Sequence, residues 1–220
     1  MTRIFLFCSL FCPLMLFSQI SVIELAEKPV PEPVTRATDV DQWNSAQKGY
    51  ADLAPEAKQM YYWTNYARLH PNRFWDSVVQ PLMRVFPNLV TPESRSLRSE
   101  LLAMAPLPAF QLNPILIGTA QKHASDIGAK QAPPSHNATN GTDFGTRIKN
   151  AGIRYCASEN ISLSSQSILL SVVLLYLDIG LPDLGHRKTL FDRNLREIGI
   201  GSALYGKDQH FLVQDFACLQ

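Results

Sequence analysis

The sequence predicts an α+β fold, and three features carry that prediction. A helical pattern runs over residues 55–70, and a second helix begins at Asn113, a good N-cap that is followed by proline. Near the C-terminus, strand-like runs over 197–205 and 210–216 flank a Gly-Lys-Asp turn, which is typical of a hairpin. Because helices precede strands rather than alternating with them, we expect an α+β arrangement.

The composition indicates a single globular domain. The chain has 220 residues, of which 46% are hydrophobic and 18% are charged, and its formal net charge is +1. That apolar content is enough for a packed core, which argues against wholesale disorder. The balanced charge provides no attraction to nucleic acid or to an anionic membrane, so a nucleic-acid partner is not expected.

The N-terminus has the order of a secretory signal. Arg3 is followed by an uncharged apolar run over 4–17, and the small residue Ser18 closes it. The run is shorter than the roughly twenty residues that a membrane-spanning helix needs. We therefore predict a signal peptide over 1–18, a secreted protein (extracellular or periplasmic) and no transmembrane helix after processing; an uncleaved N-terminal anchor is the alternative.

A proline-rich arm is expected next. The stretch 27–34 holds three prolines with charges between them, which suits neither a helix nor a strand ladder. We assign residues 19–54 to this arm or linker and residues 55–220 to the folded domain.

The first helix of the domain is expected to begin at Pro55 and to end at His70. Proline at an early position and Glu56 in the first turn both favour a helix start. The residue before Pro71 avoids the α region, which ends the helix. One face carries Ala57, Met60, Thr64 and Ala67.

The central part of the chain is expected to be mostly helical. Helices are predicted over 74–83 and 93–104, and the helix that begins at Asn113 aligns Ile117, Ala120, Ala124 and Ile127 on one face. Residues 132–142 have the composition of a loop.

A short helix, a strand and a buried helix are expected to follow. The short helix covers 143–150 and is stopped by Gly152, and the strand covers 155–161. Residues 165–177 contain the most apolar run of the chain. Periodicity does not separate helix from strand there, but the length favours a buried helix.

Short motifs in a fixed order resemble the CAP superfamily, which includes cysteine-rich secretory proteins, wasp-venom allergens, plant pathogenesis-related class 1 proteins and bacterial secreted SCP-like proteins. The motifs are Asn65-Tyr66-Ala67-Arg68, Leu112-Asn113-Pro114, Ser135-His136, Ser158-Glu159-Asn160-Ile161, Gly185-His186-Arg187, Glu197-Ile198-Gly199-Ile200-Gly201 and Gln214-Asp215-Phe216. The resemblance covers about residues 55–220. It implies a three-layer α-β-α sandwich with a solvent-facing cleft, and the segment 74–108 looks like a helical insertion.

The resemblance also implies a set of site residues. His136 and His186 match the two family histidines, which bind a divalent metal in several members, and Glu159 matches the acid of the Glu-Asn motif. The second family acid usually follows a tryptophan, and no Trp-x-x-Glu occurs here. Asp178, at the end of the apolar helix, is the substitute candidate, similar to a bacterial branch of the family.

The residues by themselves leave two interpretations of this group open. His136 lies on a polar loop and His186 follows Gly185, so neither belongs to an apolar helical face. Two imidazoles fall short of the three or four ligands of a tight zinc site, but zinc or another divalent metal could bind weakly with water filling the other positions. The alternative is a hydrogen-bonded polar cluster in which Glu159 orients a histidine.

Other polar and aromatic residues are assigned structural roles. His123 and Asp126 are expected on a solvated helix border. Loop anchoring through backbone carbonyls is expected of Asn65, Arg68 and Arg147. Trp63 and Trp75 are expected in the core. Cys156 and Cys218 are the cysteines left after signal removal; they form either a disulfide or two buried thiols.

We therefore expect a secreted binding or interaction module with a histidine–carboxylate cleft that can hold a divalent metal, and with a lipid, glycan or peptide of the cell envelope as ligand. One alternative is a metal-assisted hydrolase in which His136 and His186 hold the ion, Glu159 is the general base, and Asp178 orients a histidine or assists protonation. A purely structural cell-envelope module is another. The sequence has no G-x-S-x-G, H-E-x-x-H or P-loop motif.

Overall fold

The computed structural model describes residue 23, residues 25–164 and residues 167–220. The predicted signal peptide over 1–18 lies outside the described residues. Among the described helices, none combines the length and the apolar character that crossing a membrane requires.

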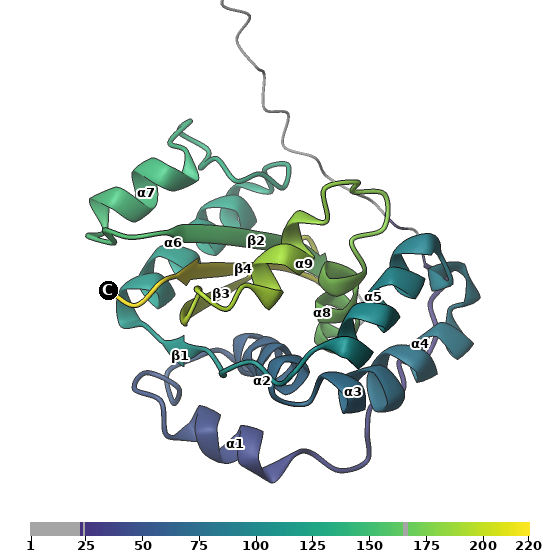
Figure 1. The fold of residues 1–220 in the computed structure, drawn as a ribbon. Coiled ribbons are helices and arrows are strands. Elements are labelled where there is room, and N and C mark those ends of the chain that lie inside the picture. Colours follow the sequence, from purple (N-terminus) through teal and green to yellow (C-terminus); the bar gives the residue numbers. More distant parts are fainter. Residues whose placement is uncertain (1–22, 24, 165–166) are drawn as a thin grey trace, which may run out of the picture.

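A four-stranded sheet forms the middle layer (Figure 1). Its strands are β1 (Gln111–Leu112), β2 (Ala157–Ser164), β3 (Glu197–Tyr205) and β4 (Gln209–Ala217), in the order β1-β3-β4-β2. The hairpin of β3 and β4 is the one expected from the sequence. Strand β1 pairs parallel with β3, and β2 pairs antiparallel with β4.

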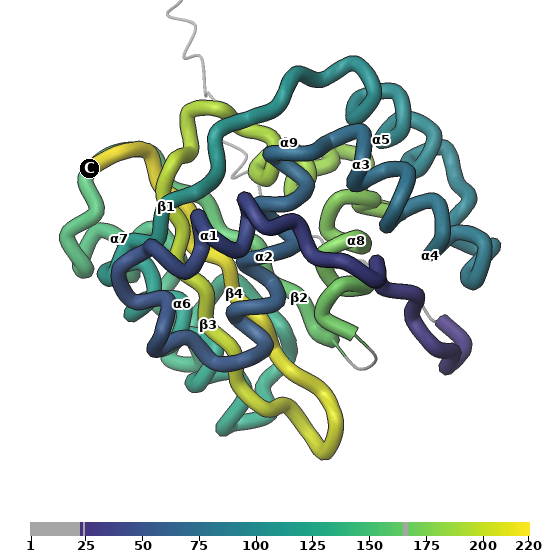
Figure 2. The backbone as a smooth tube through the Cα atoms, turned by 90° about the horizontal axis from the view of Figure 1, so that it is seen from below, coloured from purple at the N-terminus to yellow at the C-terminus, as the bar shows by residue number. Residues whose placement is uncertain are grey.

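Helices cover both faces of the sheet, as Figures 1 and 2 show from two directions. One face carries α6 (Pro114–Lys130) and α7 (Phe144–Asn150). The opposite face packs against α2 (Pro55–Leu69), α8 (Ile168–Leu177) and α9 (Gly185–Phe191). The chain is therefore the predicted α-β-α sandwich of the α+β class.

Two glycines of β3 bring α6 close to the sheet. A Cβ atom on Gly199 would lie 1.9 Å from the carbonyl carbon of Leu116, and one on Gly201 would lie 2.3 Å from the carbonyl oxygen of Ala120. Any side chain at either position would collide with the helix backbone. The close contact places α6 directly over the β3–β4 pair.

Local signals account for the helix ends. The side chain of Asn113 accepts a hydrogen bond from the backbone N–H of Ile115 (2.8 Å) and caps α6. Asp143 caps α7 in the same way through Thr146 (2.8 Å), and the chain leaves α7 through Gly152, at φ +95°. These boundaries agree with the sequence predictions to within one or two residues.

The helical insertion is more segmented than expected. Instead of one helix over 74–83, the chain forms α3 (Pro71–Phe74), a π-helical turn over Trp75–Val79 and α4 (Gln80–Val85). A 3₁₀ turn (Pro87–Leu89) and α5 (Pro92–Ala103) complete it.

Part of the segment expected as an arm belongs to the folded body. Residues Thr38–Ser45 form helix α1, in which the side chain of Val40 is fully buried. The indole N–H of Trp43 donates to the carbonyl of Phe110 (3.0 Å), and the buried amide of Asn65 binds Asn44 (2.9 Å). The proline-rich stretch that precedes α1 contains neither helix nor strand.

A buried side chain of α2 anchors the chain segments that follow α5 and end α9. The guanidinium of Arg68, fully buried in α2, donates to the carbonyls of Pro108 (2.8 Å), Leu190 (2.8 Å) and Asp192 (3.1 Å). Arg68 therefore has the expected anchoring role. Cys156 and Cys218 form a disulfide with their Cα atoms 5.5 Å apart, which ties the start of β2 to the end of β4.

Candidate functional site

The first half of the candidate site is a pair formed by His136 and Glu159. Nδ1 of His136, in the loop between α6 and α7, lies 2.9 Å from Oε1 of Glu159 on β2. The Glu159 side chain is only 1% exposed, whereas the imidazole is 35% exposed. A carboxylate that accepts at Nδ1 keeps the proton on that nitrogen, so Nε2 of the neutral ring is the free acceptor.

Arg147 of α7 completes this half of the site. One guanidinium nitrogen, Nη2, donates both to Oε2 of Glu159 (2.7 Å) and to the backbone carbonyl of His136 (3.0 Å). The Nε and Nη1 atoms of Arg147 are buried and have no hydrogen-bond partner among the described residues. The sequence interpretation of Arg147 as a loop anchor covered only the carbonyl contact.

A second buried acid lies beside Glu159. Asp215 of β4 is directly opposite Glu159 in the β2–β4 register, and it is fully buried. Thr119 of α6 donates to Oδ2 of Asp215 (2.5 Å), while Oδ1 has no hydrogen-bond donor among the described residues. The two carboxyl groups therefore face each other on the α6 side of the sheet.

The two acids have opposite pKa shifts. Burial, followed by the charge of Glu159, raises the pKa of Asp215 well above its ordinary value. Burial also opposes ionisation of Glu159, but its hydrogen bond with His136 and the charge of Arg147 outweigh burial and lower the pKa of Glu159. Asp215 therefore holds its proton to a higher pH than Glu159 does.

His123 contradicts the sequence prediction of a solvated helix border. Its residue exposure is 2%, and Nε2 lies 2.8 Å from the carbonyl oxygen of Ser135. The ring packs edge-on against Phe211, with centroids 6.0 Å apart, and burial lowers the pKa of His123. His123 therefore supports the loop that carries His136. Asp126 instead contacts Lys130 and Thr139 at the surface.

The second half of the candidate site is a pair formed by His186 and Asp178. Nδ1 of His186, in the first turn of α9, lies 2.5 Å from Oδ1 of Asp178, which follows α8 in a left-handed conformation (φ +53°). The other oxygen, Oδ2, accepts from the backbone N–H of Arg187 (3.0 Å). The carboxylate is 1% exposed and the imidazole 19%.

The two pairs approach strand β2 from opposite faces. Glu159 points toward α6, whereas the next residue, Asn160, donates to the backbone carbonyl of His186 (3.4 Å) on the α9 side. The hydroxyl of Ser158 contacts Thr189 of α9 (2.9 Å) on the same side. Each histidine thus has its own carboxylate, and the two pairs are anchored on opposite faces of β2.

The atoms that remain free to bind a metal limit which metal the site could hold. Both oxygens of Glu159 and both oxygens of Asp178 already accept hydrogen bonds from imidazole, guanidinium or backbone N–H groups. Within the described part of the chain, no three His, Cys, Asp or Glu residues are grouped so that they could bind a metal together. This chemistry does not fit a closed four-ligand zinc site. Among the four predicted site residues, it leaves only Nε2 of His136 and Nε2 of His186 free to bind a metal.

The sequence interpretation missed Asp215 and Thr119 as neighbours of the site. Asp215 lies in the Gln-Asp-Phe motif of the last strand, so its position was known, but its role was not. The available signal was a charged residue between apolar residues near the end of a strand, because a charge that is buried there requires a partner.

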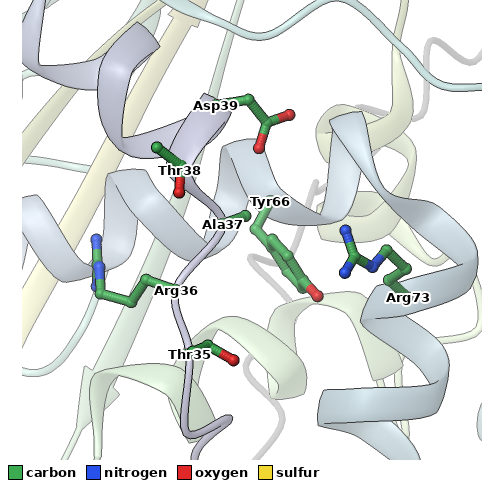
Figure 3. Close-up of a pocket in the computed structure, with 7 residues that line it drawn as sticks. All are labelled: Thr35, Arg36, Ala37, Thr38, Asp39, Tyr66 and Arg73. Carbon is green, nitrogen blue, oxygen red and sulfur yellow. The ribbon is translucent and has the colours of Figure 1, made fainter.

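A separate cavity of about 310 Å³ lies between the segment before α1 and helices α2 and α3 (Figure 3). Its lining residues are Thr35, Arg36, Ala37, Thr38, Asp39, Tyr66 and Arg73. None of the four predicted site residues contributes to it.

Comparisons with known proteins agree with the motif pattern. A family model described as the cysteine-rich secretory protein family, CAP, matches residues 61–216, well over half of the chain. No curated protein sequence matches the chain.

Three solved structures are similar to this chain at low sequence identity, each with a TM-score below 0.5. An extracellular SCP-domain protein of Bacillus anthracis is 19% identical (TM-score 0.44), and the match covers 86% of this chain and 45% of that protein, so this chain spans less than half of its length. An outer surface protein of Borrelia burgdorferi is 18% identical (TM-score 0.43; 62% and 91% covered). Venom allergen-like protein 4 of Schistosoma mansoni is 13% identical (TM-score 0.46; 76% and 90% covered). The match over residues 61–216 shows that the chain belongs to the CAP family of cysteine-rich secretory proteins.

Proposed function

We propose that this CAP protein is a secreted binding module, extracellular or periplasmic, whose ligand contacts the two imidazoles beside β2. The single observation that carries the proposal is the state of the histidines. Each ring is fixed through Nδ1 by a carboxylate that is 1% exposed, and each Nε2 has no partner among the described residues. A purely structural cluster has no need of partly exposed imidazoles with a free ring nitrogen.

A divalent metal is compatible with this proposal only as a weakly held group. A metal-binding histidine commonly directs its other ring nitrogen to a carboxylate, and both histidines do so here. His136 and His186 would supply Nε2, and a bound metal would supply a Lewis acid. Glu159 and Asp178 would orient the rings and would not bind the ion.

The hydrolase alternative receives less support from the geometry. A general base needs a free, accessible lone pair and a pKa near the working pH. The Glu159 side chain is 1% exposed, both of its oxygens are engaged, and its pKa is lowered. Glu159 therefore suits the orientation of His136 better than water activation.

The proposal is tested by isothermal titration calorimetry with zinc and by NMR of ¹⁵N-labelled imidazoles. The NMR probes are phosphatidylglycerol vesicles, chitooligosaccharides and a pool of random decapeptides. We expect at least one probe to perturb the imidazole nitrogens of His136 and His186, and the double variant His136→Ala/His186→Ala to lose that binding. The matched control is His70→Ala, which removes a partly exposed histidine that pairs with Asp39 (2.8 Å), away from both pairs.

The outcomes separate the roles of the site. Equal heats of zinc binding in the wild type and the double variant would exclude metal binding by His136 and His186. Binding of the organic probes that is unchanged in the double variant would refute the proposed binding site. Thermal unfolding of each variant shows whether a loss of binding merely reflects a loss of folding.

A further inference from the structure

Strand β2 is the long edge of the sheet, and only β4 pairs with it among the described strands. The hydrogen bond from the N–H of Cys218 to the carbonyl of Cys156 (3.0 Å) defines which residues bond to β4. Because the pattern alternates, residues 158, 160, 162 and 164 direct their backbone groups toward β4. The N–H and C=O groups of Ala157, Glu159, Ile161 and Leu163 point away from it.

These outward groups have no hydrogen-bond partner among the described residues. At Glu159 these groups are partly accessible. The residue is 7% exposed while its side chain is only 1% exposed, so the remaining exposure lies mainly on its backbone. A row of unpaired N–H and C=O groups is complementary to one kind of surface, namely another extended backbone.

The β2 edge lacks most of the features that usually block pairing. Edge strands are blocked by lysine, proline, a bulge, short length, an inward-pointing charge, or a covering helix or loop. Strand β2, with the sequence ASENISLS, has eight residues and neither lysine nor proline; its inward-pointing charge is Glu159, and the His136 loop and α9 flank the edge. The opposite edge of the sheet, β1, has two residues and is protected by its shortness.

The two faces of β2 are flanked by polar groups. On the α6 face lies the partly exposed imidazole of His136, with the largely buried guanidinium of Arg147 behind it. On the α9 face lie His186 and the amide of Asn160. A strand laid along β2 would direct alternate side chains toward these two groups, because side chains in a strand alternate between faces.

We propose that the outer edge of β2 binds an extended peptide segment as an additional strand, with His136 and His186 contacting its side chains on either face. The inference rests on the proposed function and names the ligand class of the same site. A peptide fits better than a second copy of the chain, because the loop that carries His136 and helix α9 both contact β2 and flank the approach to its edge.

The test uses Ile161→Pro. The N–H of Ile161 points outward, so proline removes a donor for the added strand without removing a hydrogen bond to β4. The matched control is Ile161→Val, which keeps that N–H with a side chain of similar size. The probe is a phage-displayed library of random decapeptides selected on the wild-type protein.

We expect the selected peptides to bind Ile161→Val like the wild type and to bind Ile161→Pro at least about fivefold more weakly, as the loss of one hydrogen bond predicts. In the wild type, peptide binding should slow hydrogen exchange at the amides of Ala157, Glu159, Ile161 and Leu163. This measurement needs no variant, so it tests strand addition even if Ile161→Pro does not fold.

Binding without added protection at these four amides would overturn strand addition, and so would a library that yields no binding peptide. The His136→Ala/His186→Ala variant separates the two proposals. Peptides that lose affinity for this double variant but leave the four amides unprotected would refute strand addition and keep the binding site. Peptides that bind the double variant and the wild type equally would refute the binding site itself.

Discussion

Replacing Asp215 by Asn tests whether the buried acid beside Glu159 carries a proton. Asp215 is fully buried, accepts from Thr119 at 2.5 Å, and faces another carboxyl group across the β2–β4 pair. A protonated Asp and an Asn have nearly the same shape, and each can donate one hydrogen bond to Glu159 while accepting one from Thr119. The substitution should therefore preserve the fold.

The effect of Asp215→Asn on stability should depend on pH. In the unfolded chain Asp215 ionises near its ordinary pKa of 3.8, whereas in the folded protein its pKa is raised well above that value. Between the two pKa values the folded state binds one more proton than the unfolded state. The free energy of unfolding of the wild type should then fall by about 1.4 kcal/mol per pH unit relative to Asp215→Asn.

The direction of this change follows from the coupling of proton binding to folding. A group whose pKa is raised in the folded protein adds to the free energy of unfolding fully below its unfolded pKa, here 3.8. That stabilisation is lost as pH rises through the folded pKa. The two proteins should therefore be similarly stable near pH 4, and Asp215→Asn should be the more stable at pH 7. Guanidinium denaturation of both proteins at pH 4 to 8 measures the difference. A difference that does not change with pH would show that Asp215 is ionised in the folded protein, and it would refute the assignment of the proton.

Three further predictions concern other parts of the molecule. Glu159→Gln removes the partner of a largely buried arginine, so it should lower the free energy of unfolding by about 3–5 kcal/mol, measured by denaturation at pH 7; a change within about 0.5 kcal/mol would contradict the buried ion pair. Gly199→Ala should destabilise the fold because its Cβ would lie 1.9 Å from α6, whereas Gly118→Ala, with nothing within 4 Å, should be neutral or slightly stabilising; equal melting temperatures for the two variants would count against the close packing. Reduction of the Cys156–Cys218 disulfide should lower stability by about 2–4 kcal/mol, and the non-reduced protein should be two hydrogens lighter by mass spectrometry; two freely alkylated thiols would rule the bridge out.

Local chemistry in the sequence accounts for most element boundaries. Asn113, Asp143 and Gly152 lie at helix ends because their side-chain or backbone chemistry acts within a few residues. The apolar run before Asp178 became a helix that is buried on nearly every side, as its length predicted. The segment that contains α1 was misread as part of the arm because the residues that bury Val40 are distant in the sequence.

The sequence alone determined the class of fold, the family pattern and the identity of His136, Glu159, Asp178 and His186 as candidates, because each depends on short motifs and their order. Tertiary structure decided which acid faces which histidine, since those contacts depend on how α7, α9 and β2 pack together. It also decided that Asp215 lies against Glu159, because strand register joins residues that are far apart in the chain. Burial and charge at such contacts are properties of the packed neighbours, and no local pattern in the sequence specifies them.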